Sequence, residues 1–270
     1  MIALSGFFFL MLSVIGSWVY RKQALLLCLM TIGTALCFIT IQTSFWAVAA
    51  LLVLGTFWCF YKKRQIRLIS FICILAFSTL FKWHAIPGMP RLFFTENFAL
   101  SLDSTLVGLI PLCFFVPLGG KNVWKVTCTQ GLLFSLTGIA LMILPALFFK
   151  IVRFAPALPS YPALRYANQL FFVVTTEEAF YRGFMQKELP TFLCQLTKKQ
   201  AQFVSYFVTT LFFTLVHWFW VSQALMLVFV FLAGGLYGLV YLKTGRLESA
   251  MLCHCLLNGV HMTFFSYHAM

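Results

Sequence analysis

Acidic residues are scarce in this chain, which has only six among 270 positions. Charged residues of both signs make up 9% of the sequence, whereas 62% of the positions are hydrophobic and 18% are aromatic. A soluble globule needs a polar surface that this composition does not supply, and a lipid bilayer is the solvent that suits it. The composition therefore excludes a separate soluble domain of useful size and predicts an integral membrane protein.

Apolar runs of span length follow one another along most of the chain. A helix needs about 20 mostly apolar residues to cross a bilayer. The runs are rich in Phe and Leu and show no strand-like alternation, which favours helices over a barrel. The sequence predicts an all-α, polytopic transmembrane helical bundle of roughly ten spans. We place them near residues 1–20, 24–42, 44–61, 66–81, 104–119, 126–149, 166–186, 203–219, 222–242 and 248–266.

Prolines predict both kinks and long connections. Pro111 and Pro117 fall in one predicted span and Pro145 falls in another, where they are expected to kink the helix. Residues 82–103 and 150–165 are proline-containing connections longer than a turn. We expect both to form ordered or interfacial loops on the outer face, which either restrict access to the bundle or simply pack against it.

Basic residues give the chain a formal net charge of +13, and they concentrate in alternate loops. Loops rich in Lys and Arg lie on the cytoplasmic side of a membrane, so the pattern predicts that both termini lie outside. These residues are explained as topology anchors that contact anionic lipid headgroups. No basic stripe suited to a duplex is present, so the expected partner is the lipid bilayer and not nucleic acid. The loops assigned to the cytoplasmic face are 21–22, 62–67, 121–125, 187–199 and 243–246.

The cysteines do not form a recognisable pattern. There are nine, an odd number, and they are scattered mostly through apolar segments. This predicts no disulfide framework, and we expect the thiols to behave as small apolar packing residues.

Two of the six acids, Glu177 and Glu178, stand side by side inside one predicted span. A charged residue at the centre of a membrane helix costs about 2.5 to 3.5 kcal/mol on insertion scales, so an acidic pair there is a candidate functional site. Glu178 and Arg182 are four residues apart and can pair along one helix face. Glu177 is turned about 100° away. The sequence therefore predicts one paired acid, which is either structural or functional, and one acid that needs another partner.

Two histidines in other predicted spans stand at helical spacing from a second notable residue. His217 follows Phe213 by four residues. His254 precedes Asn258 by four, which places an imidazole and a carboxamide on one helix face as convergent hydrogen-bonding groups. We interpret the remaining histidines, His84, His261 and His268, as packing residues.

These pairs occur in a fixed order along the chain. The order is Glu177-Glu178-x-x-x-Arg182, then Phe213-x-x-x-His217, then His254-x-x-x-Asn258. In this order they resemble the CPBP intramembrane protease family, which includes CAAX-processing endopeptidases and bacteriocin-related enzymes. Gly234, Gly235, Gly238 and the turn Thr244-Gly245-Arg246-Leu247 add to the resemblance, which covers roughly residues 162–262. We therefore divide the chain into N-terminal transmembrane helices (1–160), serving as a scaffold or for substrate access, and a CPBP-like catalytic transmembrane core (161–270).

The resemblance implies an intramembrane endopeptidase that cleaves near a membrane-embedded or lipidated segment of a protein or peptide. A carboxylate in an apolar site beside a second acid is suited to take a proton from water near neutral pH, and Glu177 is assigned this role. His217 would share or orient the same water. His254 and Asn258 would stabilise the oxyanion. Glu178 and Arg182 would hold the helix and Glu177 in place.

The sequence leaves two interpretations of whether the reaction needs a metal ion. The preferred one is a glutamate mechanism without a cofactor, because no H-E-x-x-H helix is present to supply two ligands from one face. The alternative is a catalytic zinc held by Glu177, His217 and His254, a three-ligand set with one open position.

Depth in the membrane constrains how the site forms. At the rise of a helix, Glu177 lies about 15 Å inward from Lys187, and His254 lies about 12 Å inward from Arg246. Both therefore reach the cytoplasmic half. His217 lies about 27 Å from Lys199 on the same count, too deep to meet them. We predict that residues 188–203 bend or follow the interface, so that the span containing His217 starts later or tilts.

Three other functions compete with a protease. Intramembrane acids and histidines also serve ion-coupled or proton-coupled transporters, although the inverted repeats typical of many transporters are not seen. A catalytically idle scaffold or immunity protein is the second alternative, and a purely structural polar cluster is the third. Short loops and the lack of a targeting sequence favour a bacterial inner membrane, with the active site opening towards its cytoplasmic half.

Overall fold

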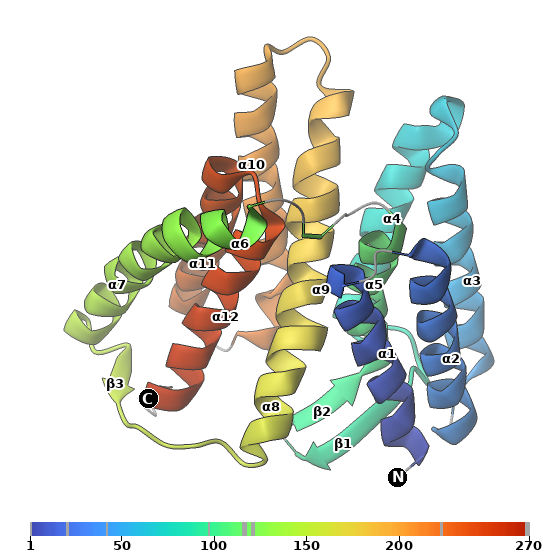
Figure 1. The fold of residues 1–270 in the computed structure, drawn as a ribbon, viewed down its shortest axis with the longest axis horizontal. Coiled ribbons are helices and arrows are strands. Elements are labelled where there is room, and N and C mark those ends of the chain that lie inside the picture. The colour runs from blue at the N-terminus through green and yellow to red at the C-terminus, as the bar shows by residue number, and fades with distance from the viewer. Residues whose placement is uncertain are drawn as a thin grey trace. The chain divides into compact units, whose positions relative to one another are not determined.

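Helices form nearly all of the chain in the computed structural model (Figure 1), which describes residues 2–19, 22–41, 43–96, 98–114, 118–119, 122–221 and 224–267. The predicted all-α membrane bundle is confirmed. The chain forms two compact units, Met1–Phe115 and Val116–Met270. All six predicted site residues belong to the second unit. Pro117, Arg21, Lys121 and His268 lie outside the described residues.

The first unit contains five α-helices and a β-hairpin within its described residues. Helices α1 and α2 pack closely because glycines line their contact: a Cβ on Gly6 would lie 2.6 Å from the Cys37 sulfur, and one on Gly33 would lie 2.8 Å from the Gly6 carbonyl oxygen. Small residues permit such backbone approach between membrane helices. The elements are α1 (Ile2–Val19), α2 (Gln23–Thr40), α3 (Phe45–Phe60), the 3-10 turn η1 (Arg64–Ile66), α4 (Arg67–Lys82), β1 (Arg91–Thr95), β2 (Phe98–Ser101) and α5 (Leu102–Phe114).

The predicted loop at residues 82–103 contains the antiparallel hairpin β1–β2. Asp103 at the start of α5 is fully buried and anchors it. Its carboxylate accepts hydrogen bonds from His84 Nδ1 (2.6 Å) and Ser101 Oγ (2.5 Å), and Arg91 Nη2 lies 3.6 Å away. His84, interpreted as a packing residue, has its ring hydrogen-bonded to this carboxylate and so ties the end of α4 to the start of α5.

The second unit carries the predicted site on a long helical run and three further helices. The run, from Pro162 to Gln186, includes two π-helical segments. The elements are α6 (Val123–Val126), η2 (Thr127–Gly131), α7 (Leu132–Phe148), β3 (Val152–Phe154), α8 (Pro162–Asn168), η3 (Gln169–Val174), α9 (Thr175–Glu178), η4 (Ala179–Gln186), η5 (Leu189–Phe192), α10 (Lys198–Val216), η6 (Trp218–Trp220), α11 (Ala224–Thr244), α12 (Leu247–Phe264) and β4 (Phe265–Tyr267).

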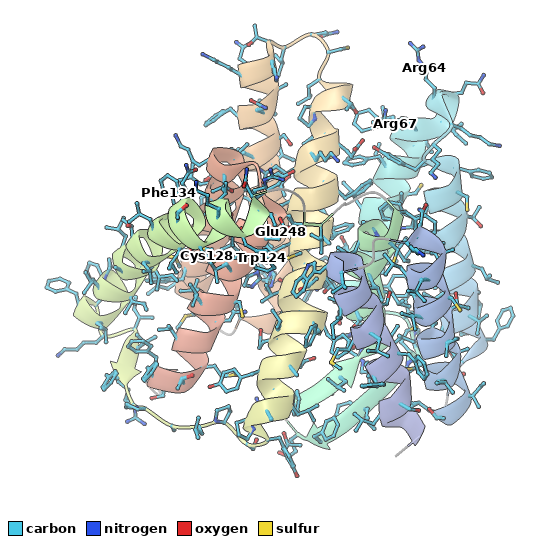
Figure 2. All side chains as sticks on the ribbon, viewed as in Figure 1. Arg64, Arg67, Trp124, Cys128, Phe134 and Glu248 are labelled. Atoms are coloured by element: carbon cyan, nitrogen blue, oxygen red, sulfur yellow. The ribbon has the colours of Figure 1, made fainter. Side chains whose placement is uncertain are left out.

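Helix α7 and the turns before it pack on the start of α12. Thr127 Oγ1 and Ser249 Oγ are 3.3 Å apart, and a Cβ on Gly131 would lie 2.8 Å from that serine oxygen. Glu248 accepts a hydrogen bond from the backbone N–H of Gly119. Figure 2 labels Trp124, Cys128 and Phe134 along α6, η2 and α7, and Glu248 beside them. The compact unit therefore begins well before residue 160, where we placed the functional division.

The second long connection, residues 150–165, is held by the chain's last strand. Strand β3 pairs antiparallel with β4, with Val152 opposite Tyr267 and Phe154 opposite Phe265. Arg153 Nε donates to Ser266 Oγ at 2.8 Å. The two ends of the segment that carries the predicted site are therefore hydrogen-bonded to each other.

Four described helices are long and apolar enough to cross a membrane by length and composition: Gln23–Thr40, Arg64–Lys82, Val123–Phe148 and Leu225–Thr244. Leu4–Val19, Phe45–Phe60 and Leu102–Phe114 are shorter apolar helices. The prediction of roughly ten spans is not confirmed. Pro111 and Pro145 do lie inside helices, α5 and α7. Figure 2 shows Arg64 and Arg67 at the turn between α3 and α4, beside one of the four candidate spans.

Helix α10 begins at Lys198, so the alternative that the helix before His217 starts later is wrong, and the alternative that its span tilts stays a prediction. Thr197 and Gln200 form a capping box that fixes this start. The helical run before it ends at Gln186 and is followed by the turn η5, so the chain does not reverse directly at Lys187. In Figure 1 the run through α9 and helix α10 lie side by side and join at one end.

Candidate active site

Polar side chains from the helical run, α10 and α12 meet in the second unit among aromatic and aliphatic residues. Glu178 and Arg182 are completely buried, and His254 and Glu177 are 3% and 5% exposed. Buried charges of this kind persist in proteins only when they are paired or hydrogen-bonded. The partners of each group therefore define what the site is able to do.

Glu178 is the centre of one half of the cluster. Its Oε1 accepts hydrogen bonds from Arg182 Nη1 at 3.2 Å and from His254 Nδ1 at 2.8 Å. The predicted i,i+4 pair of Glu178 and Arg182 is confirmed. The contact with His254 was not predicted, because it joins two helices that are far apart in the sequence.

Arg182 is stabilised by more than its carboxylate. Its Nη2 donates to the carbonyl oxygen of Gly234 on α11 at 2.7 Å. Three rings surround the guanidinium, with centroids 4.9 Å (Phe213), 5.5 Å (Tyr237) and 5.7 Å (Tyr181) from its central carbon. Cation–π contacts and a charge-assisted hydrogen bond together make a fully buried arginine tolerable.

The glycines of α11 allow this helix to come close to its neighbours. A Cβ on Gly234 would lie 2.8 Å from Phe213 Cδ1, and one on Gly238 would lie 3.0 Å from the Tyr206 ring. Gln186 Nε2 donates to the Gly238 carbonyl at 3.3 Å. Both glycines therefore permit close packing of α11, and their carbonyls act as hydrogen-bond acceptors.

Glu177 faces a different partner. Its Oε1 lies 4.0 Å from His217 Nε2, beyond direct hydrogen-bonding distance. His217 caps the end of α10, and its Nδ1 donates to the Phe213 carbonyl at 2.7 Å. A neutral imidazole that donates through Nδ1 presents Nε2 as an acceptor. The structure therefore brings Glu177 and His217 together as expected and fixes which nitrogen of the ring faces the acid.

His254 is held from two sides. Glu178 accepts from Nδ1, and the Tyr237 ring stacks on the imidazole with centroids 4.2 Å apart and an interplanar angle of 14°. A carboxylate on one nitrogen of a histidine fixes the ring's orientation and tautomer. Nε2 is left as the nitrogen that can serve a substrate.

Asn258 lies one helical turn beyond His254, on the same face of α12. Its Nδ2 donates to Gln169 Oε1 on the helical run at 3.1 Å. Gln169 was missed by the sequence analysis, and no spacing rule pointed to it. An amide nitrogen carries two hydrogens, so Asn258 keeps one donor while Gln169 holds the other.

Phe213 explains the spacing that precedes His217. Its ring lies 4.3 Å from the His217 ring, 4.9 Å from that of Tyr181 and 6.3 Å from that of His254. It also faces the Arg182 guanidinium. One aromatic side chain thus separates the Glu177–His217 pair from the buried ion pair and contacts both histidines.

The described residues contain no group of three His, Cys, Asp or Glu side chains placed to hold a metal ion. His254 uses Nδ1 to bind Glu178. The zinc alternative raised by the sequence stays a prediction.

Comparison with known families gives one match. Residues 159–260 match the family described as "Type II CAAX prenyl endopeptidase Rce1-like". The match includes all six predicted site residues and lies within the second unit. No curated protein and no solved structure shows significant similarity to the chain. The family resemblance drawn from the sequence is confirmed for this segment, and it supports a CAAX-type intramembrane protease in general.

Proposed function

Since residues 159–260 are similar to Rce1-like CAAX proteases, we propose that this chain is an intramembrane endopeptidase in which Glu177 activates water. The 4.0 Å approach of His217 Nε2 to Glu177 Oε1 carries the proposal. Glu178, the other acid of the pair, is occupied by Arg182 and His254. The acid that faces a histidine across a gap is therefore Glu177, and it is assigned as the general base.

The reaction begins with a water between Glu177 and His217. The water donates one hydrogen bond to Glu177 and one to His217 Nε2, which is an acceptor because Nδ1 donates to Phe213. Glu177 takes a proton as the water oxygen forms a bond to the scissile carbonyl carbon. When the carbon–nitrogen bond breaks, Glu177 returns this proton to the leaving nitrogen, so one water is consumed for each peptide bond cleaved.

His254 and Asn258 stabilise the oxyanion that forms on the carbonyl oxygen. His254 donates through Nε2 in its doubly protonated form, with Glu178 as the counter-charge on Nδ1. Asn258 donates through the amide hydrogen that Gln169 does not use. Donors that are fixed before the reaction and shielded from water give the largest electrostatic stabilisation of such an intermediate. Glu178, Arg182 and Gln169 provide that fixation.

The substrate is a membrane protein or lipidated peptide cleaved near its membrane-embedded or lipid-bearing segment. The family match and the position of the site among apolar helices support this class. The first unit serves as a scaffold or restricts substrate access. We place the protein in a bacterial inner membrane with about ten spans, and the site opens towards the cytoplasmic half.

The test is cleavage, by purified protein in detergent, of peptides that carry a prenyl or acyl chain near the carboxyl end. Wild type is compared with Glu177→Ala, His217→Ala and Glu96→Gln, a matched control at an exposed acid in the first unit. We expect both site variants to lose about 10²-fold or more in kcat, and the control to match wild type.

Adding a chelator separates the two catalytic mechanisms. Activity that persists with chelator supports the glutamate mechanism, and loss of activity would revive the zinc alternative. Cleavage by Glu177→Ala at the wild-type rate would refute the assigned site. A wild type that cleaves none of the peptides would favour the idle scaffold.

A further inference from the structure

The side chain of Tyr181 is buried without any use in the mechanism given so far. It is fully inaccessible, and its hydroxyl has no hydrogen-bond partner among the described residues. The neighbouring ring positions, Phe180, Phe184, Phe212 and Phe213, are all phenylalanine. A phenylalanine at 181 would fill the same space without burying a polar atom, and an unpaired buried hydroxyl calls for an explanation.

Tyr181 belongs to the layer next to the Glu177–His217 pair. It follows Glu177 by four residues, so both side chains lie on one face of the helical run. Its ring meets Phe213 edge to face, with centroids 4.9 Å apart, and Phe213 precedes His217 by four residues. Glu177 with His217 and Tyr181 with Phe213 therefore form successive layers between the run and α10.

The position of Tyr181 on its helix places it one turn after the two acids. Side chains on a helix lean towards its N-terminus, so a long residue covers the turn before its own Cα. For Tyr181 that turn carries Glu177 and Glu178.

The reacting water has a hydrogen-bonding position that Glu177 and His217 do not fill. A water that donates to these two residues keeps two lone pairs, of which one attacks the carbonyl carbon. The other accepts a hydrogen bond from a neighbouring donor. Tyr181 supplies a donor that has no partner among the described residues, on the helix face of Glu177.

We propose that Tyr181 is a further catalytic residue, whose hydroxyl donates a hydrogen bond to the water activated by Glu177 and orients its attacking lone pair. This inference rests on the proposed function. It assigns no proton transfer to Tyr181, since the proton still moves from water to Glu177 and then to the leaving nitrogen.

The first test compares Tyr181→Phe with Tyr166→Phe on a cleaved lipidated peptide. Tyr181→Phe keeps the ring contacts with Phe213 and Arg182 and removes only the hydroxyl. It should lower kcat at least about tenfold, leave KM within about twofold, and not lower the melting temperature. Tyr166 hydrogen-bonds Thr263 at 2.7 Å, so its variant should melt earlier and keep the wild-type kcat. A Tyr181→Phe enzyme with the wild-type kcat would overturn the inference.

The second test does not depend on activity. In protein labelled with ¹³C at the tyrosine ζ position, the Tyr181 signal is identified by its loss in Tyr181→Phe. In an equal mixture of H₂O and D₂O, a hydroxyl bonded to water exchanges quickly and gives one averaged line. Two separate lines would show a hydroxyl closed off from water and would also overturn the inference. If wild type cleaves nothing but the single line is present, the proposed protease function fails while the water contact of Tyr181 stands.

Discussion

Two adjacent carboxylates in the second unit have different partners. Glu178 accepts from Arg182 and His254 and is completely buried, whereas Glu177 faces His217 across 4.0 Å. The first arrangement holds a buried charge and a histidine ring, and the second places an acid and an imidazole just beyond direct hydrogen-bonding distance. The difference in partners follows from position on the helix. The face of Glu178 carries Arg182 one turn later, whereas the face of Glu177 carries no basic residue one turn away.

At this scale, we expect Glu178→Gln to harm folding more than Glu177→Gln does. Neutralising Glu178 leaves the buried Arg182 without its counter-charge, and breaking a buried pair in this way costs about 3 to 5 kcal/mol. Glu177→Gln should change stability by less than about 1 kcal/mol and still abolish cleavage. Thermal unfolding of both variants in one detergent measures the difference. Equal destabilisation would show that Glu177 is also part of the structural pair.

At the scale of elements, the site depends on how closely α11 approaches the helices beside it. Gly234 has no room for a side chain next to Phe213, and its carbonyl accepts a hydrogen bond from Arg182. Gly238 likewise has no room for a side chain next to Tyr206, and its carbonyl accepts a hydrogen bond from Gln186. The π-helical segments η3 and η4 flank the turn that carries the acids, a location typical of π-helical turns at functional sites.

Gly234→Ala should therefore reduce both stability and activity. The added Cβ would lie 2.8 Å from Phe213, so α11 must move or Phe213 must change its contacts with both histidines. Overpacking of this kind costs about 1 to 3 kcal/mol. Gly55→Ala is the control, since a Cβ there meets nothing within 4 Å, and alanine raises helix stability by up to about 1 kcal/mol. Melting temperature and kcat are measured for both variants, and a wild-type kcat in Gly234→Ala would contradict the packing argument.

At the scale of the whole molecule, the orientation of the chain in its membrane is open to a direct test. Helix α4 is part of a candidate span that separates the basic turn at residues 62–67 from the hairpin β1–β2. Loops rich in basic residues stay in the cytoplasm. Gln65→Cys should react with a membrane-impermeant thiol reagent only in permeabilised cells, and Glu96→Cys should react in intact ones. The reverse pattern would invert the proposed topology, and labelling of both on one side would exclude α4 as a span.

Local features of the molecule were predictable from the sequence, and contacts between distant segments were not. Hydrophobic runs predicted helices, and i,i+4 spacing predicted the Glu178–Arg182 pair, because both follow from helix geometry alone. The His254–Glu178 and Asn258–Gln169 contacts join residues 76 and 89 positions apart, and nothing local specifies them. The start of α10 at Lys198 was also missed, because the capping box of Thr197 and Gln200 that fixes it was not considered.

The pairing of β3 with β4 has a consequence for how this segment relates to the rest of the chain. One strand precedes the site-bearing helices in the sequence and the other follows them, and the two strands are hydrogen-bonded to each other. The segment between them is therefore closed by this pairing. If a protease cut the backbone in a surface turn such as residues 193–197, the two fragments would still be held together by the β3–β4 pairing. Because the first and last residues of this segment are adjacent, other helices can be joined before it without pulling its two ends apart. The family match covers residues 159–260, which lie between the two strands, and it includes none of the first unit.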